Sequence, residues 1–165
     1  MNRVNVLSIL PRYSRNGNKI IAEVKENSID IKYKNKTNHK AVSFTAPKYI
    51  ILDKNFLEGL GLAIGDGLNN PSITNSHFNF ANTDINLVVK VFEWLKILNI
   101  SKIQFYLNVP PKYDFGEIAE DIRKKFDIKK EDIRVYSNPR TKSPSLMIQT
   151  SNYIFQLIYL SLFSN

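Results

Sequence analysis

Alternating apolar and polar residues mark the first third of the chain as strands. Ile29, Ile31 and Tyr33 alternate with the charged residues Asp30, Lys32, Lys34 and Lys36, which is the period of two typical of a half-buried strand. Similar strands are expected over residues 19–25 and 40–45. The pattern predicts a three-stranded meander with one apolar and one lysine-lined face. Ala46-Pro47 ends it, because the residue before a proline is conformationally restricted.

After Leu52 the apolar spacing changes to that of helices. We expect helices over 54–66, 84–99, 114–126 and 151–163, and strands in a short hairpin region at 73–80 and over 102–107, 133–136 and 146–150. The helix over 84–99 is apolar nearly all round, so it should be covered on more than one side. The prediction is an α+β domain over residues 49–165, preceded by a small basic β-meander extension over residues 1–48.

The positive charge is concentrated near the N-terminus. The net charge is +8, and residues 1–50 contain ten Lys and Arg residues against three acids. Such clustering is typical of a protein that binds a polyanion. The alternative is a lysine-rich composition that only solvates one face of a sheet.

Other features of the composition exclude several classes of site. There is no cysteine, which excludes disulfides, thiolate metal sites and a thiol nucleophile. His39 and His77 are too few and too far apart for a histidine-built zinc site. The apolar stretch from Tyr153 to Phe163 is shorter than the ~20 residues that span a bilayer. We expect a soluble cytoplasmic protein with no membrane partner.

The helix over residues 54–66 is unusually rich in glycine. Gly59, Gly61 and Gly65 together cost roughly 3 kcal/mol relative to alanine. Gly61 and Gly65 lie four residues apart, on one face, where a second backbone could approach closely. This predicts a homodimer whose two-fold axis runs between two copies of the helix, with Leu57, Gly61, Leu62 and Gly65 at the interface. The alternative is that the helix packs within one subunit.

Asp66 lies at the C-terminal end of this helix, where its charge opposes the helix dipole. Two Asp66 carboxylates meeting at a two-fold axis would need cations beside them. An all-oxygen site suits Mg²⁺, which activates water and stabilises a phosphodiester transition state. The expected ligands are Asp66 and the neighbouring Gly65. The alternative is that Asp66-Gly67 is only a turn dipeptide.

The nine residues from Gly59 to Gly67 resemble the LAGLIDADG motif of homing endonucleases and related DNA-binding domains. Gly61, Leu62, Asp66 and Gly67 fall on matching motif positions. The segment from Phe80 to Leu87 and the helix after it also resemble the family's segment C-terminal to the motif, so the resemblance covers roughly residues 50–165. It implies a LAGLIDADG-like fold, with helices on one face of a curved antiparallel sheet that straddles double-stranded DNA. It also implies a homodimer joined by the motif helices, with Asp66 of each subunit binding the divalent metal.

The sequence departs from this family at three places. Ile64 replaces the earlier motif acid, and the helix over 114–126 interrupts the simplest one-motif topology. Residues 68–80 can supply only two strands of ~5 residues, each under ~20 Å long. Either the basic meander supplies the missing DNA contacts or the protein reads little sequence. The candidate DNA-contacting residues are Arg12, Arg15, Lys32, Lys34, Lys36, Lys40, Asn75 and His77.

Cleavage would also need a basic or amide group near the scissile phosphate. Lys102, Gln104 and Lys142 are the candidates beside Asp66, with Gln149 as a further amide. The prediction is a homodimeric, Mg²⁺-dependent, site-specific DNA endonuclease, a hydrolase of phosphodiester bonds. Two alternatives stay open: a non-catalytic transcriptional regulator on the same dimer, and an RNA-processing accessory protein.

Overall fold

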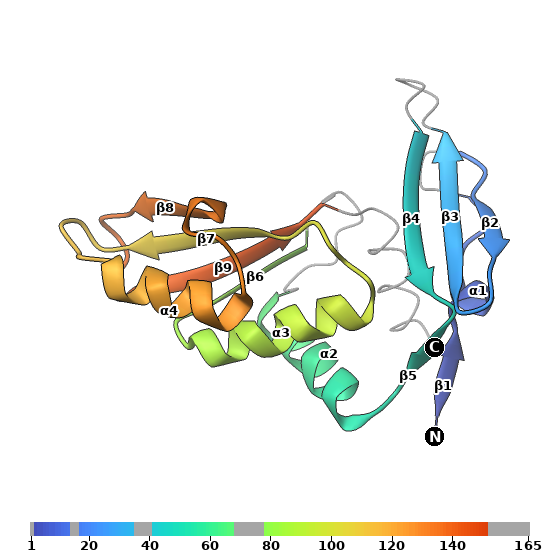
Figure 1. Ribbon diagram of the computed structural model, residues 1–165, viewed down its shortest axis with the longest axis horizontal. Coiled ribbons are helices and arrows are strands. Elements are labelled where there is room, and N and C mark those ends of the chain that lie inside the picture. Colours follow the sequence, from blue (N-terminus) through green and yellow to red (C-terminus); the bar gives the residue numbers. More distant parts are fainter. Residues whose placement is uncertain (1, 14–16, 35–40, 68–77, 152–165) are drawn as a thin grey trace.

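The computed structural model describes residues 2–13, 17–34, 41–67 and 78–151 (Figure 1). Strand β1 (Arg3–Asn5) is followed by a short helix, α1 (Val6–Ile9). Strands β2 (Ile21–Val24), β3 (Ser28–Lys34) and β4 (Ala41–Pro47) form an antiparallel sheet in the order β2-β3-β4. The predicted meander is confirmed.

The register of the meander gives it two different faces. Ile29 and Ile31 are fully buried, and Phe44 and Ala46 on β4 are paired with these positions. Lys32 and Lys34 are exposed on the other face, as predicted. That face also carries Glu23 and Asp30, which form ion pairs with Lys32 and Lys25. The alternating pattern alone did not predict these ion pairs.

The predicted boundary near residue 48 is crossed by strand pairing. Strand β5 (Tyr49–Ile51) pairs antiparallel with β1, in a two-stranded ribbon. Asn99 Nδ2, in the second part, donates a hydrogen bond of 2.8 Å to the carbonyl oxygen of Thr45 on β4. Buried residues of both parts belong to one continuous core.

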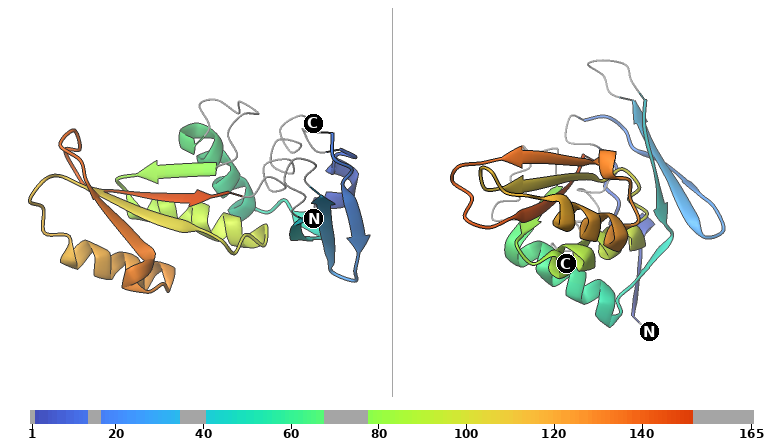
Figure 2. Two further views of the ribbon diagram at one scale, coloured as in Figure 1. Left: turned by 90° about the horizontal axis from the view of Figure 1, so that it is seen from above. Right: turned by 60° about the vertical axis from the view of Figure 1, so that its left-hand side comes forward.

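The second part is a four-stranded sheet with helices on one side, which confirms the α+β class (Figures 1 and 2). Its elements in chain order are α2 (Lys54–Gly67), β6 (Phe78–Asn82), α3 (Ile85–Ile97), β7 (Gln104–Val109), α4 (Gly116–Phe126), the 3₁₀ turn η1 (Lys130–Asp132), β8 (Ile133–Ser137) and β9 (Ser145–Thr150). The strand order is β6-β9-β7-β8. The predicted hairpin region at 73–80 is described only from Phe78, and the predicted helix over 151–163 only at Ser151.

The sheet is mixed rather than wholly antiparallel. β9 pairs antiparallel with β6 and with β7, but β8 pairs parallel with β7. Two neighbouring parallel strands need a crossover, and α4 provides it. The expectation of a purely antiparallel sheet was therefore wrong. The cause is α4, the helix that interrupts the simplest one-motif topology.

Local capping explains where the helices begin. Asp53 Oδ1 accepts from the Phe56 amide at 2.8 Å, and Asp84 Oδ1 accepts from the Asn86 amide at 2.9 Å. Asp114 Oδ1 accepts from the Gly116 amide at 3.0 Å. These side chains satisfy amides that have no partner inside the helix.

Helix α3 occupies the centre of the domain. It contacts α2, α4 and strands β6 and β9, and its buried side chains are Val88, Val91, Phe92, Trp94 and Leu95. The prediction that it is covered on several sides is confirmed. Among the helices of the described residues, none is long and apolar enough to cross a membrane.

Candidate nucleic-acid interface

The glycines of α2 serve two different purposes. Gly59 is buried against α3, and a Cβ there would come within 2.7 Å of Trp94 Cγ. Gly61 and Gly65 are exposed, and a Cβ on either would meet nothing within 4 Å. Packing against α3 therefore explains Gly59, whereas Gly61 and Gly65 have no such close neighbour among the described residues.

An apolar stripe runs along the outward side of α2. Leu57 is 52% exposed and Ile64 is 44% exposed, and Gly61 lies between them. Of the predicted interface residues, Leu57, Gly61 and Gly65 face outward, whereas Leu62 is partly buried against the core. We call Leu57, Gly61, Ile64 and Gly65 the α2 stripe.

Charged residues flank this stripe. Glu58 forms an ion pair with Lys90 of α3, and the Lys90 hydrogen bond lowers the pKa of the Glu58 carboxyl below its usual value. The pair ties α2 to α3 beside the Gly59–Trp94 contact. These two contacts hold α2 against α3, so that the α2 stripe faces away from α3.

Asp66 is the last residue but one of α2, and its side chain lies outside the described part of the structure. Within the described residues, no cluster of three His, Cys, Asp or Glu side chains could hold a metal ion. The oxygens available at this helix end are the Asp66 carboxylate and backbone carbonyls such as that of Gly65. Such donors suit Mg²⁺ by type.

The face of the four-stranded sheet away from the helices is polar and open. Alternate residues of β6, β7 and β9 are buried on the helix side, including Phe80, Leu107 and Ile148, and on β8 Ile133 is buried. The intervening residues are exposed or partly exposed, and we call them the open face: Asn79 and Ala81 on β6; Ser145, Met147 and Gln149 on β9; Gln104, Tyr106 and Asn108 on β7; Arg134 and Tyr136 on β8. None of these described positions carries a carboxylate.

Strand register aligns three amides across this face. Asn79 is paired with Gln149, and Gln149 is paired with Gln104. Side chains directly opposite in neighbouring strands lie about 5 Å apart at Cβ. The three amides therefore form one row across β6, β9 and β7, which we call the amide row.

Aromatic rings and a guanidinium group occupy the neighbouring part of the open face. The rings of Tyr106 and Tyr136 are stacked, with centroids 5.9 Å apart and an interplanar angle of 27°. Arg134 Cζ lies 5.6 Å from the centroid of the Tyr106 ring. The Tyr106 hydroxyl donates to Gln104 Oε1 at 2.7 Å, which links the aromatic group to the amide row.

The predicted catalytic side chains do not all lie together. Gln104 is the first residue of β7, and Lys102 is exposed in the segment just before it. Lys142 lies in the β8–β9 connection, at the opposite end of β7. The six residues of β7 span about 17–20 Å, so Lys142 is a strand's length away from Gln104. Gln149, paired with Gln104, is the nearer amide.

The lysine-lined face of the meander is partly neutralised. Lys25 forms an ion pair with Asp30, and Lys32 Nζ lies 3.9 Å from Glu23 Oε2. Hydrogen bonds from Lys25 and then from Thr45 hold the pKa of the Asp30 carboxyl below its usual value. Lys34 is exposed and has no ion pair with any described residue. Arg12 is also exposed. The other predicted contacts, Arg15, Lys36, Lys40, Asn75 and His77, lie outside the described residues.

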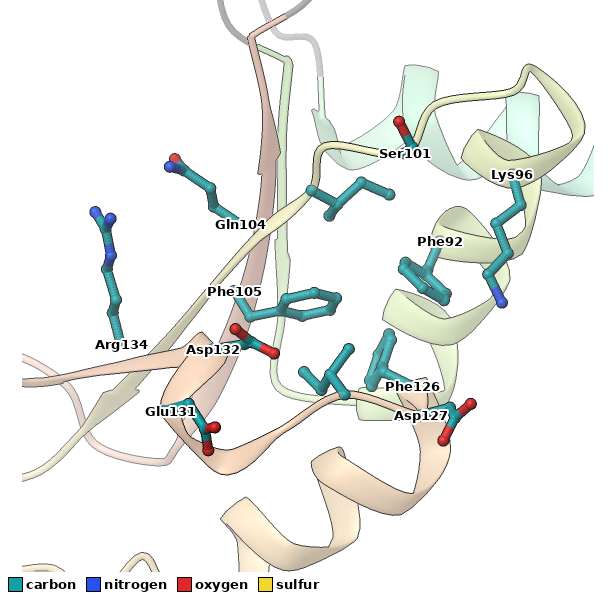
Figure 3. A pocket seen from close by; sticks show the side chains of 12 residues that line it. Phe92, Lys96, Ser101, Gln104, Phe105, Phe126, Asp127, Glu131, Asp132 and Arg134 are labelled. Carbon is teal, nitrogen blue, oxygen red and sulfur yellow. The ribbon is translucent and has the colours of Figure 1, made fainter.

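A pocket of about 620 Å³ lies beside the starts of β7 and β8 (Figure 3). Its floor is formed by Phe92, Phe105 and Phe126, whose centroids are 5.0–5.7 Å apart. Its lining also includes the acids Asp127, Glu131 and Asp132 and the bases Lys96 and Arg134. Gln104 and Arg134 point away from the phenylalanines (Figure 3). The acidic rim does not favour a phosphate.

Most of the open face was not predicted from the sequence. Gln104 and Gln149 were identified, but not Asn79, Tyr106, Arg134 or Tyr136. The alternation of polar and apolar residues over 104–109 and 133–136 was the available signal.

The basic cluster on α4 is paired with acids of the same helix, as in Arg123–Glu120 at 2.7 Å. These pairs make it a solvated helix face. Set against known proteins, the chain matches no protein-family model, no curated protein and no solved structure.

Proposed function

We propose that the protein binds double-stranded DNA as a homodimer, with the open face of the sheet as its DNA-contacting surface. The observation that carries this proposal is the amide row, together with the absence of carboxylates from the described positions of the open face. Asn and Gln side chains form paired hydrogen bonds with the edge of adenine, and Arg does so with guanine. A surface of amides with Arg134 therefore suits base edges in a major groove.

The charge distribution supports the same partner. The net charge of +8 lies mostly in residues 1–50, which include the meander. In Figure 1, the C-terminal end of β3 extends past the level of the four-stranded sheet, on the side opposite the helices that cover that sheet. A duplex on the open face would pass beside this basic sheet. Phosphate contacts there would supply affinity, and base contacts would supply specificity.

The α2 stripe supports the homodimer. It places two exposed apolar side chains beside two glycines, Gly61 and Gly65, that leave the backbone accessible. Contiguous exposed apolar surface marks interaction sites. Pairing two copies through α2 would bring the two open faces into one DNA-contacting surface with two-fold symmetry, in a LAGLIDADG-like arrangement.

Within this dimer we propose Mg²⁺-dependent hydrolysis of a phosphodiester bond. Asp66 of each subunit would hold the metal, which when bound supplies an activated water and stabilises the transition-state charge. Gln104 and Lys102 lie at one end of the sheet and would orient water or contact the scissile phosphate. Lys142, at the other end, would contact the DNA elsewhere. The second candidate, a non-catalytic transcriptional regulator, is favoured by the concentration of charge outside the α2–sheet domain.

The experiment is cleavage of a randomised duplex-DNA library with and without Mg²⁺, comparing wild type with Asp66→Asn. Sequence-selective cuts that need both Mg²⁺ and Asp66 would support the endonuclease and reveal the target. Salt-sensitive binding without any cuts would favour the regulator. Tighter binding to structured RNA than to duplex DNA at matched salt would favour RNA processing.

A readout independent of cleavage tests the metal ligands. Ca²⁺ or Mg²⁺ should raise the melting temperature of the wild-type dimer more than that of Asp66→Asn. Asp127→Asn is the matched control, since Asp127 is an exposed acid at the end of another helix, α4. It should keep the wild-type response. An equal response in wild type and Asp66→Asn would contradict metal binding at Asp66.

A further inference from the structure

The open face contains an aromatic group that the reading of duplex DNA does not require. Arg134 and Tyr136 both lie against the ring of Tyr106, and Tyr136 is 49% exposed. Tyr106 is fixed from its other end by the hydrogen bond to Gln104. The group is therefore preorganised, with Tyr136 as its exposed member.

Unpaired bases are the part of a nucleic acid that stacks on such rings. A base inside a duplex has both faces covered by its neighbours, whereas a bulged, flipped or single-stranded base has a free face. Aromatic side chains on sheets bind these free faces, and arginine adds cation–π and phosphate contacts. Arg134 is exposed and has no ion pair with any described residue, so its charge is available for the phosphate beside such a base.

The position of the group also favours this ligand. It lies on β7 and β8 at one edge of the sheet, whereas the amide row crosses β6, β9 and β7. Strand β8 is the strand that α4 brings in parallel to β7, so the α4–β8 segment extends the open face by an aromatic edge. A nucleic acid crossing this face would meet amides first and then stacked rings.

We propose that Tyr136, with Tyr106 and Arg134, forms a stacking site for an unpaired base of the bound nucleic acid. This inference rests on the proposed function, because it assumes that nucleic acid lies on the open face. It adds that the preferred ligand is a duplex with an unpaired base next to the paired region, rather than a fully paired duplex.

The test compares three labelled DNA duplexes by fluorescence anisotropy: fully paired, with a one-base bulge, and with the same bulge lacking its base. The wild type should bind the bulged duplex about 5- to 150-fold more tightly than the other two, the range expected for stacking of one base. Tyr136→Leu should remove this preference, so that the variant binds the bulged duplex no more tightly than the other two. Leucine keeps an apolar side chain opposite its strand neighbour but has no π face, so a merely structural role would be retained.

Two variants separate stacking from other effects. Tyr136→Phe keeps the ring and should keep the preference. Tyr49→Leu is the matched control, because Tyr49 is 38% exposed and lies 4.5 Å from the Arg3 guanidinium, but on the β1–β5 ribbon. Tyr49→Leu should leave the preference for the bulged duplex unchanged.

The outcomes distinguish this inference from the proposed function. Equal binding of all three duplexes by the wild type, or an unchanged preference in Tyr136→Leu, would overturn the stacking site and leave duplex binding intact. If only single strands bind, and binding depends on Tyr136, the stacking site stands and duplex binding is wrong. Single-stranded DNA and RNA of one sequence, measured in parallel, identify which nucleic acid supplies the base.

Discussion

Gly59 of α2 lies directly against Trp94 of α3, with no room for a side chain between them. Trp94 is in turn enclosed by Phe56 and Phe78, whose ring centroids lie 6.1 and 6.0 Å away. This contact fixes α2 on α3 and so determines which side of α2 faces outward. Gly61 and Gly65 fall on that outward side, where a Cβ would meet no described residue within 4 Å.

The first prediction separates the two kinds of glycine. Gly59→Ala should destabilise the subunit by about 1–2 kcal/mol, because overpacking costs about 1–3 kcal/mol and helix propensity returns up to ~1 kcal/mol. Gly61→Ala and Gly65→Ala should stabilise the isolated subunit by up to ~1 kcal/mol each, since they meet no neighbour. Urea unfolding at low protein concentration measures these differences. A destabilising Gly61→Ala would show that this face is packed within the subunit.

The second prediction concerns the homodimer. Gly61→Leu or Gly65→Leu should give a folded monomer, because the added side chain has space in one subunit but would separate two closely packed helices. Light scattering measures the mass, and urea unfolding checks the fold. Lys124→Leu is the control, since it also adds an exposed leucine to a helix, on α4. It should remain a dimer. A monomeric wild type would contradict the prediction and exclude a metal site shared between two Asp66 residues.

Local patterns in the sequence predicted the elements well. The predicted helix starts near residues 54, 84 and 114 lie close to the observed ones, because Asp53, Asp84 and Asp114 each accept a hydrogen bond from an amide only two or three positions away. The strands of the meander were equally local, since each joins the next through a short connection.

Arrangements that depend on distant pairing could not be predicted in the same way. The amide row exists because Gln149 lies between Asn79 and Gln104, although these residues come from three separate segments. The parallel pairing of β8 depends on where α4 returns the chain. Likewise, the spacing places Gly61 and Gly65 on one face of α2, but it does not show that Gly59 packs against α3, which depends on the position of Trp94.

The third prediction is a pH dependence of stability that originates at Asp30. Its pKa is lowered below the usual 3.8 by hydrogen bonds from Lys25 and Thr45, so the folded state favours the charged carboxylate. A lowered folded-state pKa contributes stability above the unfolded pKa, which is lost as the pH falls through the folded one. The wild type should therefore be more stable than Asp30→Asn at pH 7, and the difference should shrink below pH ~4. Urea midpoints for both proteins at pH 7 and pH 3 test this. If the difference in urea midpoint between the two proteins is the same at pH 7 and pH 3, the effect of the substitution arises from packing and not from the charge of Asp30.

The fourth prediction concerns the charge of the meander. Lys34 is exposed and has no ion pair with any described residue, so a phosphate contact there would release a counterion from DNA. Lys34→Gln should reduce the slope of log affinity against log salt concentration by about 0.9, for specific and non-specific duplexes alike. The matched control is Lys125→Gln, which makes the same charge change on α4, where Lys125 is 3.3 Å from Asp121 and on the helix side of the sheet. Its slope should equal that of the wild type. If both variants reduce the slope equally, the meander contributes only net charge, and the duplex does not contact it at Lys34.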